Sequence, residues 1–440
     1  MTTNQLTANA EVVSKDGNRY VVEKLLGAGT QGEVYSVTNG GKAYALKWYL
    51  PGNGSIEQAK LLHNLVETGT PSKRFLWPIE LVKDATGSGL GYVMELRKPD
   101  YGSMVDLMKG RIVPGFRGLC TAGVGLADGF QRLHAKGLCY RDISFGNIFL
   151  HGGTGEILIC DNDNVAPENS KTGVIGTDRF MAPEIVMGAA LPSQQTDLFS
   201  LSVLLFYMFV LSHPFEGRIE YDIRCLDAAA MKMLYGEKPV FIFDPNDASN
   251  RPVPGYHVNA EAIWPLLPTA LQEAFTRAFT AGIKDPVNGR VRESEWKSVL
   301  SAARDSILYC QHCRSENFYD AQRLGASGEL GTPCWCCSKQ VQLPPRIRID
   351  KRSTVMLNDG ACLYAHHTER ASEYQFATPT AQVVQHPTNK TIWGLKNRSA
   401  ETWTVFSADG SSQQVPPDRS FTIATGTRVV FGKVEGEIRA

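Results

Sequence analysis

The sequence predicts an α+β protein with a small β-rich lobe, a larger helical lobe, a short cysteine-rich module and a terminal all-β sandwich. Apolar and polar residues alternate around glycine-rich breaks over 19–50, which is typical of antiparallel strands. From about 115 to 305, apolar residues instead recur at three- and four-residue spacing, as in helices. Alternation returns after 345, in runs separated by Gly, Asp and Asn. At 440 residues the chain is too long for one hydrophobic core, so several domains are expected.

The same patterns predict individual elements and boundaries. Strands are expected near 20–22, 33–37, 43–47, 79–83 and 91–96, and helices over 118–134, 198–211 and 266–279. The segment 235–254 is rich in Pro, Asp and Asn, which predicts a long surface loop. We expect four regions: an N-terminal tail at 1–17, a two-lobed domain at 18–305, a cysteine module at 306–345 and the sandwich at 346–440.

The charge balance and the hydropathy of the chain indicate which partners and which location to expect. Lys plus Arg and Asp plus Glu number 45 each, so the balance does not indicate nucleic acid or an anionic membrane as a partner. Residues 1–10 lack the basic start and apolar stretch of a secretory signal. The longest apolar run, 198–211, is shorter than the roughly 20 residues that cross a bilayer. We therefore expect a cytoplasmic protein without a membrane partner.

A glycine-rich segment and a lysine suggest a phosphate site. Residues 27–34 read G-x-G-x-x-G-x-V between two predicted strands, which favours a hairpin over nucleotide phosphates rather than a dinucleotide-binding turn. A purely structural hairpin explains these glycines equally well. Lys47 follows on the third strand, where its ammonium could reach the α and β phosphates of ATP.

Three polar side chains further along supply the chemistry of phosphoryl transfer. Asp142 precedes Asn147 by five residues, and Asp161 stands at the end of a later predicted strand. A carboxylate such as Asp142 can orient a substrate hydroxyl and accept its proton. Asn147 and Asp161 offer the oxygen ligands that Mg²⁺ or Mn²⁺ prefers. With Lys47, these residues predict a catalytic set for ATP and a divalent cation.

The order and spacing of these motifs, followed by Met181-Ala182-Pro183-Glu184, resemble the eukaryotic-like protein kinase family over residues 18–305. The resemblance implies a bilobal protein kinase fold and an ATP-dependent Ser/Thr kinase with protein substrates. It also implies a gatekeeper followed by a hinge that faces adenine. The expected ATP-binding residues are Gly27, Ala28, Gly29, Gly32, Val34, Ala45, Lys47, Met94, Glu95 and Leu96.

The resemblance also implies residues that support the site. A buried Asp would brace the catalytic loop, a Thr would support Asp142, an Arg would pair with a phosphate on the activation segment, and a Glu–Arg pair would hold the helical lobe. Ordinary loop hydroxyls remain the alternative to phosphorylation sites in that segment. In the order given, these roles fall on Asp197, Thr177, Arg141, and the pair Glu184 and Arg290.

The acidic partner of Lys47 is harder to assign. Glu57 opens the predicted helix 56–66 and is the expected partner. Gln58 is the alternative, because it fits the apolar register of that helix better.

The sequence departs from the family pattern at several positions. Ser144 stands where Ser/Thr kinases usually carry a lysine, and Tyr140 replaces the usual histidine. Asp161-Asn162-Asp163 replaces Asp-Phe-Gly, which keeps the metal ligand and adds a second carboxylate. These changes keep two alternatives open, a nucleotide-binding pseudokinase scaffold and an adaptor that acts through its zinc and β modules. The intact catalytic set favours an active enzyme.

Cysteines concentrate in the module that follows. Cys310 and Cys313 form one C-x-x-C pair, and Cys334 and Cys337 form a second. Four thiolates on two such turns suit a closed tetrahedral Zn²⁺ site, whose binding energy could fold a segment too small for its own core. We therefore predict structural Zn²⁺ in a zinc ribbon. Redox function is the alternative, and Cys336 or His312 could replace one ligand.

The C-terminal region resembles part of a forkhead-associated β-sandwich. The resemblance lies in 393–399, 408–410 and 430–432. Such domains bind phosphothreonine, although the matching early loop here lacks the usual arginine. The whole chain is similar to kinases of bacterial tellurite-resistance-type systems. Short sequence segments such as Phe75-Leu76-Trp77-Pro78 carry this similarity. This resemblance implies a metal-dependent Ser/Thr phosphatase and a von Willebrand A-domain protein as partners.

Overall fold

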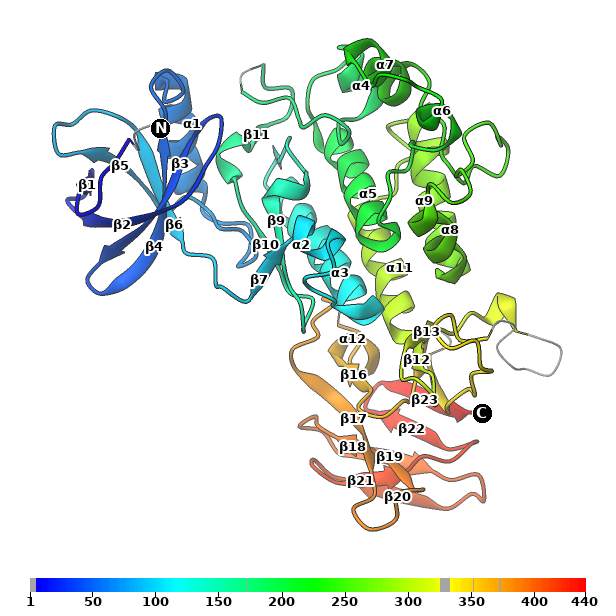
Figure 1. Ribbon diagram of the computed structural model, residues 1–440. Helices are drawn as coiled ribbons and strands as arrows, with labels where there is room; N and C mark the ends of the chain where they lie inside the picture. Colours follow the sequence, from blue (N-terminus) through cyan, green and yellow to red (C-terminus); the bar gives the residue numbers. More distant parts are fainter. Residues whose placement is uncertain (1–4, 172, 325–332, 351, 372) are drawn as a thin grey trace.

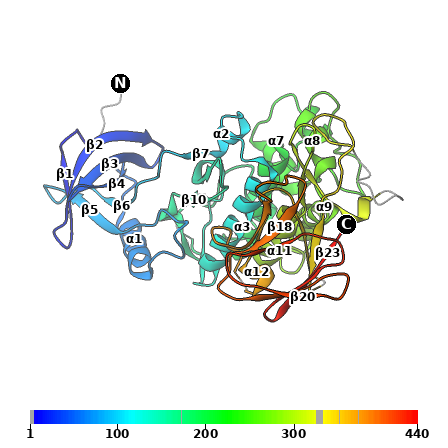
Figure 2. The ribbon, with the colours of Figure 1, turned by 90° about the horizontal axis from the view of Figure 1, so that it is seen from below.

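The computed structural model describes residues 5–171, 173–324, 333–350, 352–371 and 373–440. A β lobe lies at one end of the molecule, a helical lobe lies at its centre, and the C-terminal sheets pack beneath the helical lobe (Figure 1). Figure 2 shows the same order from below, with the C-terminal strands under the helices and away from the β lobe. The predicted α+β order of lobes is confirmed.

The β lobe is a closed barrel of antiparallel strands in the order β1-β2-β3-β4-β6-β5, with one helix against it. Its register places Lys47 opposite Val34 and Ala45 opposite Met94, so that residues distant in sequence face the same space. Ser55 caps the helix by accepting a hydrogen bond from the Gln58 backbone N–H. The elements are β1 (Glu11–Ser14), β2 (Arg19–Ala28), β3 (Gly32–Asn39), β4 (Lys42–Tyr49), α1 (Ile56–Thr68), β5 (Glu80–Asp84) and β6 (Gly91–Glu95).

The predicted tail at 1–17 is wrong in part, because Glu11–Ser14 form a strand of this barrel. Strand β1 pairs with β2 on one side and with β5 on the other, and so closes the barrel. Val12 is fully buried, and Leu6 joins the same apolar cluster. The burial of these two side chains holds the segment against the lobe.

The helical lobe is built around α5, whose residues from Thr196 to Val210 are all buried. A Ser193–Thr196 capping box begins this helix, and Leu211 ends it in the left-handed conformation. Four short strands, β8 to β11, lie between α3 and α4, and β7 precedes α2. The helices are α2 (Met104–Met108), α3 (Gly115–His134), α4 (Pro183–Val186), α5 (Gln194–Val210), α6 (Arg218–Tyr221), α7 (Ala228–Lys232), α8 (Val258–Ile263), α9 (Thr269–Phe279), α10 (Ala281–Lys284) and α11 (Glu293–Asp305). The strands are β7 (Tyr101–Ser103), β8 (Leu138–Cys139), β9 (Ile148–His151), β10 (Ile157–Ile159) and β11 (Ala166–Pro167).

The segment 235–254 is mostly irregular, as predicted, but it is not a simple surface loop. Phe241 and Ile242 are buried in the core of the helical lobe, and Asn250 is buried beside them. The Asn250 amide donates hydrogen bonds to the carbonyls of Phe215 and Val240, at 2.8 and 2.7 Å. The segment therefore packs as part of the lobe.

The chain ends in a small cysteine module and two antiparallel sheets. One sheet has the order β15-β14-β23-β22-β19-β20 and the other β16-β17-β18-β21, and a single apolar core draws side chains from both. The elements are β12 (Ile307–Tyr309), β13 (Glu316–Phe318), β14 (Arg346–Ile349), β15 (Ser353–Met356), β16 (Cys362–Tyr364), α12 (Ala365–Thr368), β17 (Pro379–Gln385), β18 (Trp393–Asn397), β19 (Trp403–Phe406), β20 (Ser412–Val415), β21 (Ser420–Thr422), β22 (Arg428–Phe431) and β23 (Val434–Arg439).

Buried contacts fix the C-terminal sheets to helix α11. The Arg304 guanidinium lies 4.0 Å from the ring centroid of Phe376 and 5.1 Å from that of Tyr364. One residue later, the Asp305 carboxylate accepts a hydrogen bond of 2.9 Å from Nε2 of His367. His367 Nδ1 accepts from the Tyr364 backbone N–H, so both ring nitrogens are engaged in this contact.

Among the residues described, we find no helix that combines the length and the apolar character needed to cross a membrane.

Candidate active site

A cleft of about 970 Å³ is lined by residues of both lobes. All of the predicted ATP-binding residues except Glu95 line it. Glu95 is exposed and pairs with Lys42 at 3.0 Å, so its side chain takes no part. The apolar part of the lining suits a planar base. It includes Leu26, Val34, Ala45, Leu76, Met94, Leu96 and Phe149.

Two aspartates hold the Lys47 ammonium deep in the cleft. Its Nζ contacts the carboxylates of Asp161 and Asp163, with a distance of 2.9 Å to Asp163. The side-chain oxygen of Gln31, a residue of the glycine-rich loop, lies 3.3 Å from the same nitrogen. Burial alone would lower the pKa of Lys47, but the two carboxylates outweigh burial and raise this pKa. Lys47 is therefore charged.

The predicted contact between Glu57 and Lys47 is wrong. Glu57 is exposed on the first turn of α1, where it hydrogen-bonds with its N-cap, Ser55. Gln58 instead faces inward, and its side-chain NH₂ donates to the Asp163 carbonyl at 2.9 Å. The apolar register of the helix therefore indicated the inward position correctly, while the preference for an acidic partner did not.

The carboxyl groups of Asp161 and Asp163 have opposite pKa shifts, although both contact Lys47. Burial and the neighbouring Asp163 raise the pKa of Asp161. Burial would also raise the pKa of Asp163, but Lys47 outweighs it and lowers that pKa. Asn162 anchors the turn between them, since its amide donates to the carbonyls of Leu76 and Ile159 at 2.8 and 3.1 Å.

Asp142, Asn147 and Thr177 meet on the floor of the cleft. The Asn147 amide NH₂ donates to the carbonyl oxygen of Asp142 at 2.8 Å and to its carboxylate at 3.2 Å. The Thr177 hydroxyl donates to the other carboxylate oxygen of Asp142. With its NH₂ group occupied, Asn147 has its amide oxygen left for a cation. This arrangement could position a hydroxyl at Asp142 beside a metal held by Asn147 and Asp161.

Asp197 binds the backbone of the loop that carries Asp142. Its carboxylate accepts from the N–H groups of Tyr140 and Arg141, at 2.5 and 2.9 Å. His134, a residue that the sequence analysis did not single out, donates from Nε2 to Asp197 at 3.0 Å and also contacts Glu293. Burial would lower the pKa of His134, but the hydrogen bonds to Asp197 and Glu293 outweigh it and raise the pKa to about 9.

This raised pKa predicts that the stabilising contribution of the charged His134 falls with rising pH. The charged His134 stabilises the folded state fully below its ordinary pKa of 6.5, and the contribution disappears as pH rises through about 9. At about 1.36 kcal/mol per pKa unit, His134→Gln should remove on the order of 3 kcal/mol of this pH dependence. Denaturant unfolding at pH 6, 7.5 and 9 measures it. His63→Gln, at an exposed imidazole, is the matched control. Equal pH slopes for His134→Gln and the wild type would contradict this account.

Glu184 and Arg290 form the predicted ion pair, and the Arg290 side chain is buried. Arg290 donates to both carboxylate oxygens of Glu184, at 2.7 and 2.9 Å, and to the Gln195 carbonyl at 2.6 Å. Arg141 is also buried, and its guanidinium reaches the Ser170 carbonyl at 3.4 Å. Within the described part of the chain, its Nε and Nη1 have no hydrogen-bond partner.

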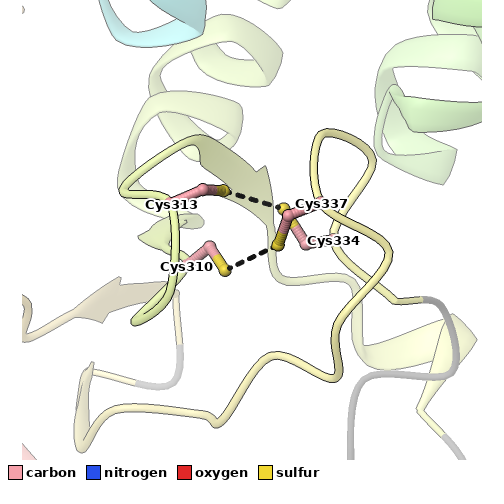
Figure 3. A group of neighbouring side chains, drawn as sticks. All are labelled: Cys310, Cys313, Cys334 and Cys337. Carbon is pink, nitrogen blue, oxygen red and sulfur yellow. Dashed lines mark hydrogen bonds between the residues drawn. The ribbon is translucent and has the colours of Figure 1, made fainter.

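The four predicted cysteine ligands lie together on two facing loops (Figure 3). The Sγ atoms of Cys310 and Cys337 are 3.7 Å apart, and those of Cys313 and Cys334 are 3.6 Å apart. A disulfide would need about 2.05 Å. A tetrahedral ion with bonds of about 2.3 Å places its sulfur ligands about 3.8 Å apart, so the spacing fits such an ion.

Neither of the two predicted substitutes belongs to this sulfur cluster. Cys336 is exposed on the loop between Cys334 and Cys337. His312 likewise stands outside the cluster of four side chains, although its backbone N–H lies 3.4 Å from the Cys310 sulfur.

Polar side chains of the C-terminal segment 393–399 have partners within the chain. Arg398 donates to Asp418 at 3.0 Å, and Lys396 lies 3.4 Å from the same carboxylate. Ser399 accepts from the Trp403 indole N–H at 3.1 Å and donates to the side-chain oxygen of Asn397 at 2.8 Å.

Comparisons with known proteins agree with the two lobes and the cleft. Residues 99–252 match the family model of the protein kinase domain. Protein kinase C delta type of Rattus norvegicus is 36% identical over 99 residues, which are 22% of this chain and 14% of that protein. Serine/threonine-protein kinase PkaB of Streptomyces coelicolor is 28% identical over 219 residues, 46% of this chain and 51% of that one. Serine/threonine-protein kinase SAPK9 of Oryza sativa is 25% identical over 225 residues, which are 46% of this chain and 57% of that protein.

The chain therefore spans between 14% and 57% of the length of these three relatives. The matched segment 99–252 contains Asp142, Asn147 and Asp161, while Lys47 and the glycine-rich loop precede it. The cleft brings both groups together. Residues 99–252 are therefore similar to the protein kinase domain, and two of these relatives are serine/threonine-protein kinases.

Proposed function

We propose that the protein is an ATP-dependent Ser/Thr protein kinase that transfers the γ-phosphate of ATP to protein hydroxyls. One observation carries the proposal: a single cleft of about 970 Å³ is lined by the glycine-rich loop, Lys47, Asp142, Asn147 and Asp161. Among these side chains, Lys47 and Asp161 are 114 residues apart in sequence. Catalysis of phosphoryl transfer depends mainly on positioning and on charge stabilisation, which this convergence supplies.

Each residue has one role in the proposed reaction. Lys47 and the backbone of the glycine-rich loop bind and orient the phosphates. Asp142 orients the attacking hydroxyl and takes its proton, and Thr177 holds the Asp142 carboxylate in place. Asp197 fixes the loop from below through two backbone N–H groups. Ser144 carries no charge, so charge stabilisation of the transition state by side chains falls more heavily on Lys47.

A divalent cation such as Mg²⁺ or Mn²⁺ fits the donor set. Asp161 lines the cleft with a carboxylate that is 30% exposed, and Asn147 lines it beside Asp142. When bound, the cation would neutralise phosphate charge. These two residues would hold it through hard oxygen donors.

Purified protein, ATP labelled at the γ-phosphate, and a Mg²⁺ salt test the proposal. We expect label on serine or threonine of the protein itself or of a generic substrate. Tight ATP binding without any transfer would instead support the pseudokinase scaffold.

We also propose that the four-cysteine site binds structural Zn²⁺ in a zinc ribbon. The sulfur spacing supports this, and the metal would hold Phe318 and Trp335 against Phe116 of α3, where ring centroids lie 4.8 and 6.4 Å apart. Metal analysis of reduced protein should give about one zinc per chain, and Cys334→Ser should bring this well below one half. Cys336→Ser, in the same loop, is the control and should retain the metal. Less than about half an equivalent in the wild type would refute the zinc site.

The remaining parts of the proposal concern organisation and partners. We propose a kinase domain at 18–305, with the barrel strand Glu11–Ser14 added to it, a zinc ribbon at 306–345 and a forkhead-associated-like sandwich at 346–440. We also propose cytoplasmic bacterial phosphorylation signalling with a metal-dependent Ser/Thr phosphatase and a von Willebrand A-domain protein. The sequence resemblance supports this last part. Co-purification of the chain with both partner types tests it, and recovery of neither would count against it.

A further inference from the structure

The two carboxylates on Lys47 occupy different environments. The Asp161 side chain is 30% exposed and lines the cleft. The Asp163 side chain is 1% exposed and lies behind the cleft wall, yet it is 2.9 Å from the Lys47 ammonium. A ligand that enters the cleft therefore meets Asp161 but not Asp163.

Hydrogen bonds from β4 and α1 hold Asp163 in place. The Tyr49 hydroxyl, two residues after Lys47 on β4, donates to the Asp163 carboxylate. Gln58 of α1 donates from its side-chain NH₂ to the Asp163 carbonyl at 2.9 Å and lies 3.2 Å from the Tyr49 hydroxyl. Lys47 and Tyr49 thus both contact the carboxylate, while Gln58 secures the backbone behind it.

From this geometry we propose that Asp163 is the positioning residue for Lys47, in the place where the sequence predicts a glutamate on helix α1. The inference rests on the proposed kinase function. A buried ammonium needs a counter-charge that stays when ligands bind. If a cation takes Asp161, Asp163 remains beside Lys47 and holds the ammonium in place toward the phosphates.

Helix α1 supplies no alternative partner. Its acidic residues, Glu57 and Glu67, are both exposed, and its inward-facing polar residue is the amide Gln58. The helix therefore contributes to the site by holding Asp163 rather than by a charge of its own. This differs from a second metal-binding role for Asp163, because both oxygens of its carboxylate already contact Lys47 or Tyr49.

The experiment uses the full chain with three variants and two readouts. Asp163→Asn removes the charge, Asp163→Asn with Gln58→Glu returns a carboxylate from α1, and Tyr49→Phe removes only the hydroxyl. Equilibrium binding of ATP and of adenosine is measured first, and phosphate transfer second. Glu67→Gln is the matched control on the same helix, and Glu57→Gln tests the acidic partner that the sequence predicts.

We expect Asp163→Asn to weaken ATP binding and slow transfer, each by about 100-fold, because Lys47 loses its orientation. Adenosine binding should not change, since it lacks the phosphates. The double variant should recover at least about tenfold of the loss, and folded Tyr49→Phe should bind ATP about fivefold more weakly.

Three results would overturn the inference: unchanged ATP affinity in folded Asp163→Asn or Tyr49→Phe, full recovery of Asp163→Asn by added Mg²⁺ alone, or a loss in Glu57→Gln that equals that in Asp163→Asn. If Asp163→Asn does not fold, Tyr49→Phe decides the question. A wild type that binds ATP without transferring phosphate would refute the proposed function, and the binding arm would still test Asp163.

Discussion

Asp142→Asn is expected to lower the rate of phosphate transfer by about 10³-fold while ATP affinity stays within a few fold of the wild type. The amide can still hydrogen-bond with Thr177 and Asn147, so the loop should keep its shape. It cannot accept the proton of the attacking hydroxyl. Because Asp142 lies on the floor of the cleft and makes no contact with the lysine that binds phosphate, ground-state binding should survive.

Transfer rates and ATP binding are measured on the same preparations of wild type and variant. Asp222→Asn, at an exposed carboxylate beyond α6, is the control and should behave as the wild type. Equal labelling by Asp142→Asn and wild type would remove Asp142 from the reaction. A parallel loss of ATP affinity would indicate instead that the residue shapes the nucleotide site.

Arg304→Ala is expected to lower the free energy of unfolding of the full chain by about 2–4 kcal/mol. The side chain is 6% exposed. Its guanidinium stacks against Phe376 and Tyr364 and donates to the Thr121 hydroxyl at 3.0 Å. Arg304 also donates to the Tyr364 hydroxyl at 3.2 Å. Truncation removes the ring contacts and both hydrogen bonds and leaves the aromatic face of the C-terminal sheets without its partner.

Denaturant unfolding and limited proteolysis between the two parts measure this loss. Arg304→Lys keeps the charge but not the planar stacking, so an intermediate loss is expected. Glu373→Gln breaks an exposed ion pair with Arg132 across the same interface, and it should cost less than about 1 kcal/mol. If Arg304→Ala were as stable as the wild type, the contact would not be what holds the C-terminal sheets to α11.

The sequence predicts the site best where a motif is local. The glycine-rich loop, Lys47 and the Asp142–Asn147 pair have fixed spacings on predictable strands and loops, and the cleft unites them. Strand β1 escaped prediction because four residues carry little periodicity and its second partner, β5, lies about 70 residues away. The burial of Phe241 and Ile242 was not predicted, because the turn residues around them favour a surface loop.

The partner of Lys47 shows a different limit. Choosing an acid on α1 relied on charge, while the phase of the helix pointed to Gln58. The actual carboxylate, Asp163, is 116 residues from Lys47, and only the tertiary fold brings the two together. His134 was missed for the same reason, since its partners Asp197 and Glu293 lie 63 and 159 residues away. No local pattern distinguishes such residues from ordinary core positions.

Parallel labelling with ATP that carries the radioactive phosphorus at either the γ or the α position tests the central claim most directly. Wild-type protein with Mg²⁺ should acquire acid-stable label on serine or threonine from the γ-labelled nucleotide and none from the α-labelled one. Label from the α position would mean that the cleft transfers a nucleotidyl group instead. Absence of label from both, in protein that binds ATP, would contradict the assignment of these residues to phosphoryl transfer.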